Sequence, residues 1–159
     1  MICFRYYGEP VGKGRPRVTA RKSKKNDNAV FAHAYTPKKT REFEDAIRFE
    51  FKATTSEPMP LFSKDIPLGM GIVMAFSVPK SYTKKRTKAC LSGEEMHTKK
   101  PDADNVAKAV MDALQGLAFE DDSQVVYMTL EKVYRAEPFV EVKIYPLRGA
   151  GYENNMRIL

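Results

Sequence analysis

The residues best suited to chemistry in this sequence are two short groups of carboxylates. Asp102 and Asp104 stand two positions apart in one group, and Glu120, Asp121 and Asp122 follow one another in the second. Hard oxygen donors without a cysteine or histidine favour Mg²⁺ or Mn²⁺ over zinc. If Asp102, Asp104 and Asp122 converge in the fold, their mutual repulsion requires a bound cation or a raised pKa.

The residues between the two groups predict an amphipathic helix that positions both. Apolar side chains recur there at helical spacing and leave Lys108 on the opposite, solvent side. Helix capping explains Asp104 alone, because an acidic residue suits the dipole at a helix start. An EF-hand calcium loop is excluded, since its sixth position is Ala107 where that loop needs glycine. The apolar positions of the expected helix are Val106, Ala109, Val110, Ala113, Leu114 and Leu117.

The charge distribution sets this stretch apart from the rest of the chain. The net charge is +7, yet residues 101–122 contain six acidic side chains and the single basic residue Lys108. A basic protein suits polyanions in general and does not select DNA over RNA or a membrane surface. Carboxylates that hold a metal on a basic protein are the arrangement expected where a phosphodiester is both bound and cut.

Two basic blocks are candidates for phosphate binding. Residues 13–25 contain seven basic side chains and no acidic one, and glycine and proline would hold Lys13, Arg15 and Arg17 in a turn. We interpret residues 13–30 as a basic flexible loop that grips DNA, although a solvated loop explains the composition equally well. The second block is an expected basic loop that follows Pro79 and leads to Lys99 and Lys100. The other candidate phosphate contacts are Lys38, Lys39, Lys84, Lys85, Arg86, Lys99 and Lys100.

The hydrophobic pattern predicts a single α+β domain over residues 1–159. We expect a mixed sheet of about four strands packed with two main helices, of which the first begins at Thr36-Pro37 and ends near Lys52. The last two strands should form an antiparallel hairpin around a turn at residues 135–138, and residues 149–159 should be a loose tail. The run at residues 68–78 is apolar on both faces, which predicts a central strand. The expected strands cover residues 2–7, 68–78, 124–134 and 139–145.

The composition and the hydrophobic runs indicate the class of protein and the compartment in which it is expected. Hydrophobic residues make up 43% of it and charged residues 30%, which favours a folded domain over a disordered one. Its longest nearly apolar run, residues 68–78, is too short for a membrane helix, and its start lacks the plan of a signal peptide. With two cysteines, Cys3 and Cys90, no disulfide framework is implied. We expect a cytoplasmic protein without a membrane partner.

Residues 100–126 resemble the signature of the RusA family of crossover (Holliday) junction endodeoxyribonucleases. That signature reads K-P-D-x-D-N-x-x-K-x-x-x-D-x-L, then a short spacer, then D-D and a hydrophobic strand. The GKGRPRV segment near the start and the YTP opening of the first helix also match. The fixed positions present here are Lys100, Pro101, Asp102, Asp104, Asn105, Lys108, Asp112, Leu114, Asp121 and Asp122.

The resemblance implies a Mg²⁺-dependent, structure-selective endonuclease, with Mn²⁺ as a substitute metal. It implies a homodimer that resolves branched DNA, a four-way junction, by paired symmetric nicks. It assigns the catalytic, metal-binding acids to Asp102, Asp104 and Asp122, and an essential cation that stabilises the transition state to Lys108. Lys108 can also be read as a surface lysine paired with Asp112.

Three further assignments concern the surroundings of these residues. Asn105 is expected to orient a ligand carboxylate, and Asp121 to support Asp122, because adjacent residues of an extended chain point to opposite sides. Asp112 is expected to be structural. Two other functions stay open: a less selective nuclease that acts on flaps or forks, and a non-catalytic nucleic-acid-binding domain.

Overall fold

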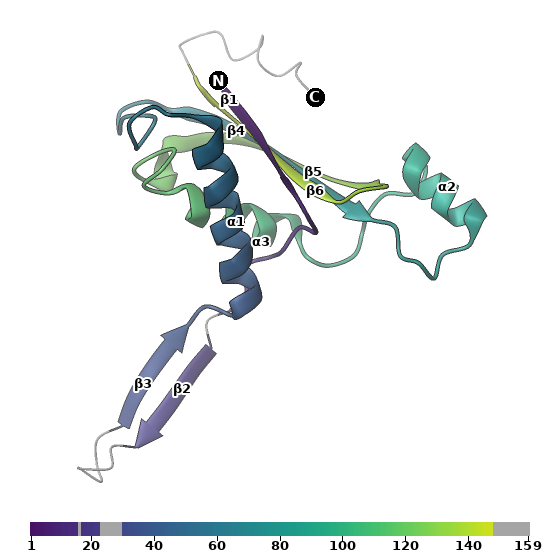
Figure 1. The fold of residues 1–159 in the computed structure, drawn as a ribbon, viewed down its shortest axis with the longest axis horizontal. Helices are drawn as coiled ribbons and strands as arrows, with labels where there is room; N and C mark the ends of the chain where they lie inside the picture. The colour runs from purple at the N-terminus through teal and green to yellow at the C-terminus, as the bar shows by residue number, and fades with distance from the viewer. Residues whose placement is uncertain (16, 23–29, 148–159) are drawn as a thin grey trace.

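A four-stranded sheet carries the fold, and two helices pack against one of its faces (Figure 1). The computed structural model describes residues 1–15, 17–22 and 30–147. The strands of the sheet are β1 (Ile2–Tyr7), β4 (Leu68–Ser77), β5 (Val125–Arg135) and β6 (Phe139–Pro146), and the helices are α1 (Lys38–Thr54) and α3 (Ala103–Leu114). The strand order is β1-β6-β4-β5, with β4 parallel to β5 and antiparallel to β6. The predicted α+β class and mixed four-stranded sheet are confirmed.

The side chains of β4 explain its central place. The face of β4 that points away from the core is also covered. On that face, a Cβ atom at Gly69 would lie 2.4 Å from the ring of Tyr145, so only a residue without a side chain fits there. A strand covered on both faces is typical of the middle of a sheet, as the sequence predicted for this segment. The face of β4 that belongs to the core presents the buried residues Leu68, Met70, Ile72, Met74 and Phe76.

Each of the two helices buries one stripe against the sheet. α1 buries Phe43, Ile47 and Phe51, and the ring of Phe51 meets Phe4 of β1 edge-on. α3 buries five of the six apolar positions that the sequence predicts, and Lys108 stays exposed. The helix ends at Leu114, so the sixth position, Leu117, lies half-buried beyond it. Burial of each larger aliphatic side chain stabilises this packing by about 1.5–3 kcal/mol, so α3 is held along its length. The buried residues of α3 are Val106, Ala107, Ala109, Val110, Ala113 and Leu114.

The predicted hairpin between the last two strands is wrong. β5 and β6 run in opposite directions, but β4 lies between them, and Met74 of β4 pairs with Lys132 on one side and Val140 on the other. The local sequence indicates the reversal of chain direction and carries no information about a third strand in the gap. β4 and β5 are parallel neighbours, so the chain between them crosses over through α3.

A third helix, α2 (Lys84–Ser92), forms where the sequence analysis expected a basic loop. The hydroxyl of Thr83 accepts a hydrogen bond from the backbone N–H of Arg86 at its start, and Gly93 ends it with a φ of 84°. The hydrophobic pattern could not predict it because Cys90 is its single buried residue, which leaves almost no apolar stripe. None of the helices in the described part of the chain is long and apolar enough to cross a membrane.

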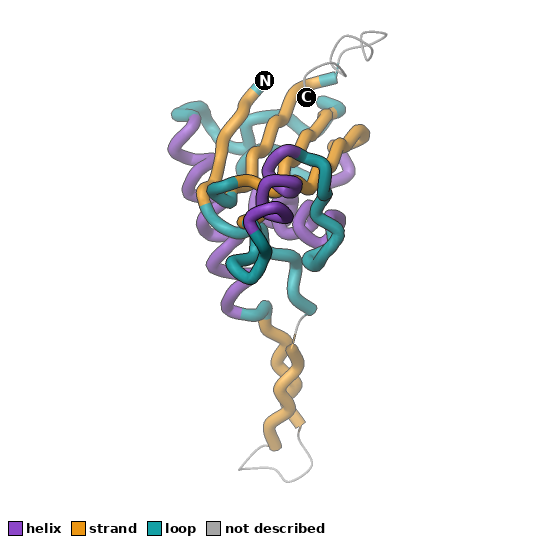
Figure 2. The backbone as a smooth tube through the Cα atoms, turned by 90° about the vertical axis from the view of Figure 1, so that its right-hand side faces the viewer, coloured by secondary structure: helices purple, strands orange, loops and turns teal. Residues whose placement is uncertain are grey.

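The basic segment near the start also contains regular structure. Strands β2 (Arg17–Lys22) and β3 (Val30–Tyr35) pair in antiparallel register, from Arg17 opposite Tyr35 to Lys22 opposite Val30. This pair extends away from the sheet and helices (Figures 1 and 2). The expected flexible loop over residues 13–30 is therefore partly a two-stranded ribbon, with residues 16 and 23–29 outside the described residues. The predicted loose tail at 149–159 also lies outside them.

Candidate functional site

The start of α3 presents two exposed carboxylates. Asp102 is the residue before the first helical turn, with extended backbone angles, and its side chain makes no capping hydrogen bond. Its carbonyl accepts the bond from Val106 N–H at 3.2 Å, and Asp104 lies in the first turn. Among the described residues, neither carboxylate takes part in an ion pair. Four carboxylate oxygens are thus available to a ligand.

A strap formed by residues 11–14 passes directly beside these carboxylates. The backbone N–H of Lys13 donates to the carbonyl of Asn105 at 2.8 Å. A Cβ atom at Gly12 would lie 3.0 Å from Cβ of Pro101 and 3.3 Å from Cβ of Asn105, so glycine allows the close approach. The strap therefore fixes the first turn of α3 from one side.

Lys13 joins this strap to both helices. Its ammonium lies 2.7 Å from Oε1 of the buried Glu44 on α1 and 2.5 Å from Oδ2 of Asp112 on α3. Burial lowers the pKa of Lys13, but its hydrogen bonds to Asp112 and Glu44 outweigh that effect and hold the pKa above its usual value. The predicted phosphate contact of Lys13 stays a prediction, and in the structure its charge is already balanced by two carboxylates.

This arrangement also separates the roles of Lys108 and Asp112. Asp112 binds Lys13, which fits the structural role expected for it. The alternative pairing of Lys108 with Asp112 is not formed, and Lys108 is exposed one turn after Asp104. Within the described residues, Lys108 takes part in no ion pair.

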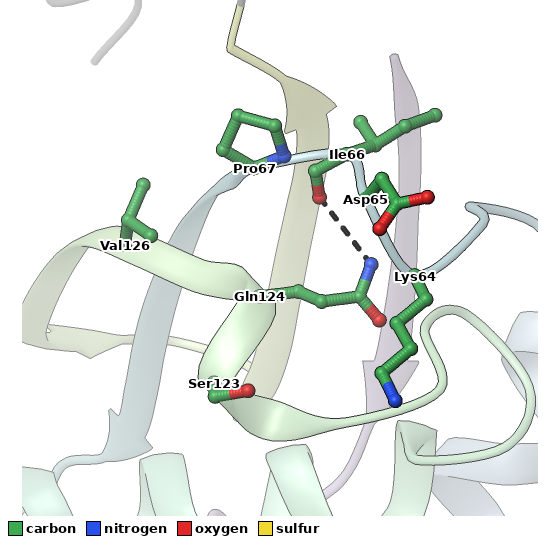
Figure 3. Close-up of a pocket in the computed structure, with 7 residues that line it drawn as sticks. All are labelled: Lys64, Asp65, Ile66, Pro67, Ser123, Gln124 and Val126. Carbon is green, nitrogen blue, oxygen red and sulfur yellow. Dashed lines mark hydrogen bonds between the residues drawn. The ribbon is translucent and has the colours of Figure 1, made fainter.

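The second acidic group lies in a short turn before β5. Gln124, which ends this turn, binds the carbonyl of Ile66 (Figure 3). The amide oxygen of the buried Gln124 accepts from the backbone N–H groups of Glu120 and Asp121 at 2.9 and 3.2 Å. Its amide nitrogen donates to the carbonyls of Ser63 and Ile66 at 2.9 and 3.3 Å. These four bonds fix the turn onto the loop before β4.

Asp121 and Asp122 differ within that turn. Asp121 caps a short 3₁₀ helix, and the hydrogen bonds from Ser123 lower the pKa of its carboxyl. Asp122 is exposed in the same helix, and no described residue forms an ion pair with it. Asp121 is thus occupied by its local turn, whereas the Asp122 carboxylate is open.

A single chain does not bring the three predicted metal ligands together. Asp102 and Asp104 precede or begin α3, and Asp122 lies beyond its other end. The 12 residues of α3 extend over about 18 Å at 1.5 Å per residue. Among the described residues, no group of three or more histidine, cysteine, aspartate or glutamate side chains is arranged to hold a metal ion.

A cluster of rings and cations beside residues 99–101 was missed by the sequence analysis. Lys132 of β5 donates from Nζ to the carbonyl of Pro101 at 2.9 Å and to that of Lys99, and lies 5.6 Å from the ring of Phe76. His97 stacks on Phe76, with ring centroids 3.8 Å apart, and burial, then the charge of Lys132, lower its pKa. A lone lysine in a strand has no sequence signal that predicts such contacts.

The remaining predicted phosphate contacts lie on β2, α1 and α2 and in the loops that contain Arg15 and residues 99–100. Arg86 binds Glu95 through two nitrogens at 2.7 to 3.0 Å and lies over the ring of Tyr82, so its charge is partly engaged. Lys99 lies 4.9 Å from the same ring. Arg17 begins β2, and its side chain is outside the described part. The exposed members of the set are Arg15, Lys38, Lys39, Lys84, Lys85, Arg86, Lys99 and Lys100.

Comparison with known proteins gives two matches. Residues 7–145 match the family Endodeoxyribonuclease RusA. The chain is also 37% identical over 145 residues to the uncharacterized protein YqaN of Bacillus subtilis (strain 168), a match that covers 90% of this chain and 94% of that protein. The family match includes both acidic groups, Lys108 and Lys132.

Proposed function

The chain belongs to the RusA endodeoxyribonuclease family, and from this membership we propose that it is a Mg²⁺-dependent nuclease that resolves four-way DNA junctions by paired symmetric nicks. The observation that carries the proposal is the pair of exposed carboxylates at the start of α3. They have no ion-pair partner among the described residues, on a chain of net charge +7. A site that only bound DNA would gain nothing from carboxylates that repel phosphate.

The donors at this site fit a hard divalent cation. Asp102 and Asp104 offer exposed oxygen atoms, and Asp102 makes no competing capping bond. We propose that they hold Mg²⁺, or Mn²⁺ in its place, and that Asn105 orients one of these carboxylates. Bound there, the metal would supply Lewis acidity toward the phosphodiester.

A homodimer would complete the set of ligands. One chain separates Asp122 from Asp102 and Asp104 by the length of α3. In a two-fold dimer each chain meets the same surface of the other, so Asp122 of the partner subunit can serve the site that this chain begins. Two such sites also match the two-fold symmetry of a four-way junction, where paired nicks require two active sites.

Lys108 would act directly on the reacting phosphate. It is exposed on the same side of α3 as Asp104 and four residues after it, and Asp112 does not engage it. A fixed cation at this position stabilises the charge that develops on the phosphate and on the leaving oxygen. The lysine needs no proton transfer for this role.

The basic elements around the site would hold the arms of the junction. The exposed lysines at the starts of α1 and α2 and in residues 99–100 suit phosphate contacts, as does Arg15 beside the β2–β3 ribbon. Arg15→Ala should weaken junction binding and flatten its salt dependence by about one counterion. Lys13→Met should change that slope less, because Glu44 and Asp112 already neutralise Lys13.

The deciding experiment compares a synthetic four-way junction with a forked duplex and a linear duplex of matched sequence. Each is incubated with the protein and Mg²⁺, and in parallel with EDTA. We expect paired nicks on the four-way junction and none in EDTA. Equal cutting of the fork would favour the less selective nuclease, and binding without cutting under any divalent metal would favour the binding domain.

A further inference from the structure

Residues 99–101, which lead into the proposed metal site, are held by a lysine from a distant strand. Lys132 lies in β5, at the edge of the sheet, opposite Met74 of β4. Its ammonium donates to the carbonyl of Pro101 at 2.9 Å and to that of Lys99. One side chain thus binds the loop at two points immediately before Asp102.

These bonds are of a kind that fixes a backbone. An ammonium donates up to three hydrogen bonds, and charge-assisted bonds are roughly twice as strong as neutral ones. The side chain is half-buried, and its ammonium lies 5.6 Å from the Phe76 ring, within the range of a cation–π contact. With two carbonyls and a ring around it, Lys132 is oriented toward the loop and away from bulk solvent.

The same segment is also held by the strap of residues 11–14. Gly12 packs against Pro101, and Lys13 N–H binds the carbonyl of Asn105. Residues 99–105 therefore have two supports, one from the strap and one from the single side chain of Lys132.

The direction of the Asp102 carboxylate depends on this support. Its side chain makes no capping bond, so its own contacts do not orient it, and the backbone before α3 does. A metal site tolerates displacements of its ligands of about 0.2 Å, and outer groups that orient ligands change metal affinity by roughly 10–100-fold when removed. A lysine that fixes the backbone at residues 99 and 101 sets the position of Asp102, and its loss should therefore change metal affinity by an amount of this size.

We propose that Lys132 is a positioning residue, which holds residues 99–101 so that Asp102 is directed at the metal. This inference rests on the proposed nuclease function. The direction of the change in metal affinity distinguishes this role from a simple charge effect. Removal of a nearby positive charge would by Coulomb's law tighten the binding of a cation. Loss of the support predicts the reverse.

The test compares Lys132→Met, Lys132→Arg and Lys143→Met with the wild-type chain. Methionine keeps most of the apolar stem and removes the donors, arginine restores donors, and Lys143 is a matched control, a half-buried lysine of β6 that binds Glu141 instead of the loop. Mn²⁺ affinity is measured by calorimetry without DNA. Amide hydrogen exchange of peptides that cover residues 98–106 is measured by mass spectrometry without metal.

We expect Lys132→Met to weaken Mn²⁺ binding by roughly 10-fold or more and to speed exchange in residues 98–106. Lys132→Arg should recover most of both properties, Lys143→Met should change neither, and junction binding in EDTA should be unchanged in all three. Tighter Mn²⁺ binding by Lys132→Met would overturn the proposal, as would unchanged exchange. If Lys132→Met does not fold, Lys132→Gln takes its place with the same expected signs.

Different results would overturn the proposed nuclease function and the role of Lys132. A wild-type chain that binds no Mn²⁺ and nicks no junction would overturn the proposed function and this role of Lys132 with it. A wild-type chain that binds metal and nicks, with Lys132→Met equal to it in Mn²⁺ affinity, would overturn the role of Lys132 alone.

Discussion

The two ends of α3 carry carboxylates that are held in opposite ways. At the far end, the neutral amide of Gln124 makes four hydrogen bonds that fix the turn of Asp121 and Asp122. At the near end, the support is the charged side chain of Lys132, and the Asp102 side chain has no capping bond. The far turn is held by hydrogen bonds within the chain. At both ends, exposed carboxylates have no ion-pair partner among the described residues: Asp122 at the far end, and Asp102 and Asp104 at the near end.

A third carboxylate on the same helix sharpens the contrast. Asp112 is neutralised by Lys13, which also binds Glu44. Asp112 is thus paired within the fold, whereas Asp102 and Asp104 at the start of the same helix are exposed and unpaired among the described residues. Removal of one partner from a half-buried ion pair destabilises the fold, whereas an exposed, unpaired carboxylate is free to bind a ligand.

The largest expected effect separates these two kinds of acid. Asp104→Asn should lower junction cleavage by roughly 10³-fold or more, because electrostatic stabilisation at the metal is the main source of catalysis in such sites. Its melting temperature and its junction binding should be retained. Asp112→Asn should show the reverse, with cleavage kept and stability lowered by about 1 kcal/mol. Nicking assays and urea denaturation of both variants measure the difference, and equal cleavage by the two would remove the distinction.

Mixed dimers test whether the two ends of α3 meet across subunits. Asp104→Asn and Asp122→Asn chains should each be inactive alone. When they are mixed and exchange subunits, half of the dimers are mixed and each has one intact site, so about a quarter of wild-type nicking should return. The products should be single nicks. No recovery, despite exchange demonstrated with tagged chains, would mean that each site is built within one chain.

The far turn should lose stability when its amide is removed. Gln124→Ala removes four part-buried hydrogen bonds and leaves the backbone N–H groups of Glu120 and Asp121 without the amide oxygen that they donate to. It should lower the free energy of unfolding by about 2–3 kcal/mol. Gln115→Ala, an exposed glutamine at the same end of α3, is the control and should be nearly neutral. Urea denaturation measures both, and similar values for the two would show that the four bonds contribute little.

The smallest expected effect is on the pH dependence of stability, through His97 in the cluster beside residues 99–101. Burial lowers the pKa of His97 below its usual 6.5, so the unfolded chain binds a proton more readily than the folded one. Stability is therefore lost as the pH falls below about 6.5. His97→Phe, which keeps the stack on Phe76, should reduce by a few degrees the fall in melting temperature between about pH 7.5 and pH 5. An identical fall in both chains would exclude His97 as its source.

Local pattern was sufficient for much of this architecture. The apolar spacing of residues 106–117 predicted a helix, which forms as α3 and ends at Leu114, and the run at residues 68–78 predicted a central strand, which forms as β4. Both signals come from burial, which leaves a period in the sequence. The carboxylates of the candidate site were found because their residue types and spacing are unusual on a basic chain.

What the sequence could not provide is information about partners across the fold. The insertion of β4 between β5 and β6 depends on pairing between distant residues, and the polar helix α2 has no apolar stripe to indicate it. Lys13 and Lys132 are both basic residues in unremarkable surroundings, yet one neutralises two acids and the other binds backbone carbonyls. The sequence shows that a lysine is charged but not which groups its ammonium contacts, and those contacts decide its role.

The position of β6 has a consequence for biosynthesis. β6 is the last strand of the sheet along the chain, and it joins the first strand, β1, to β4. Until residues 139–146 have left the ribosome, β1 has no neighbour and one edge of β4 is unpaired. Unpaired strand edges promote aggregation, and pairings between distant residues form slowly. In the nascent chain, the edges of β1 and β4 therefore stay exposed until the final strand inserts between them and completes the sheet.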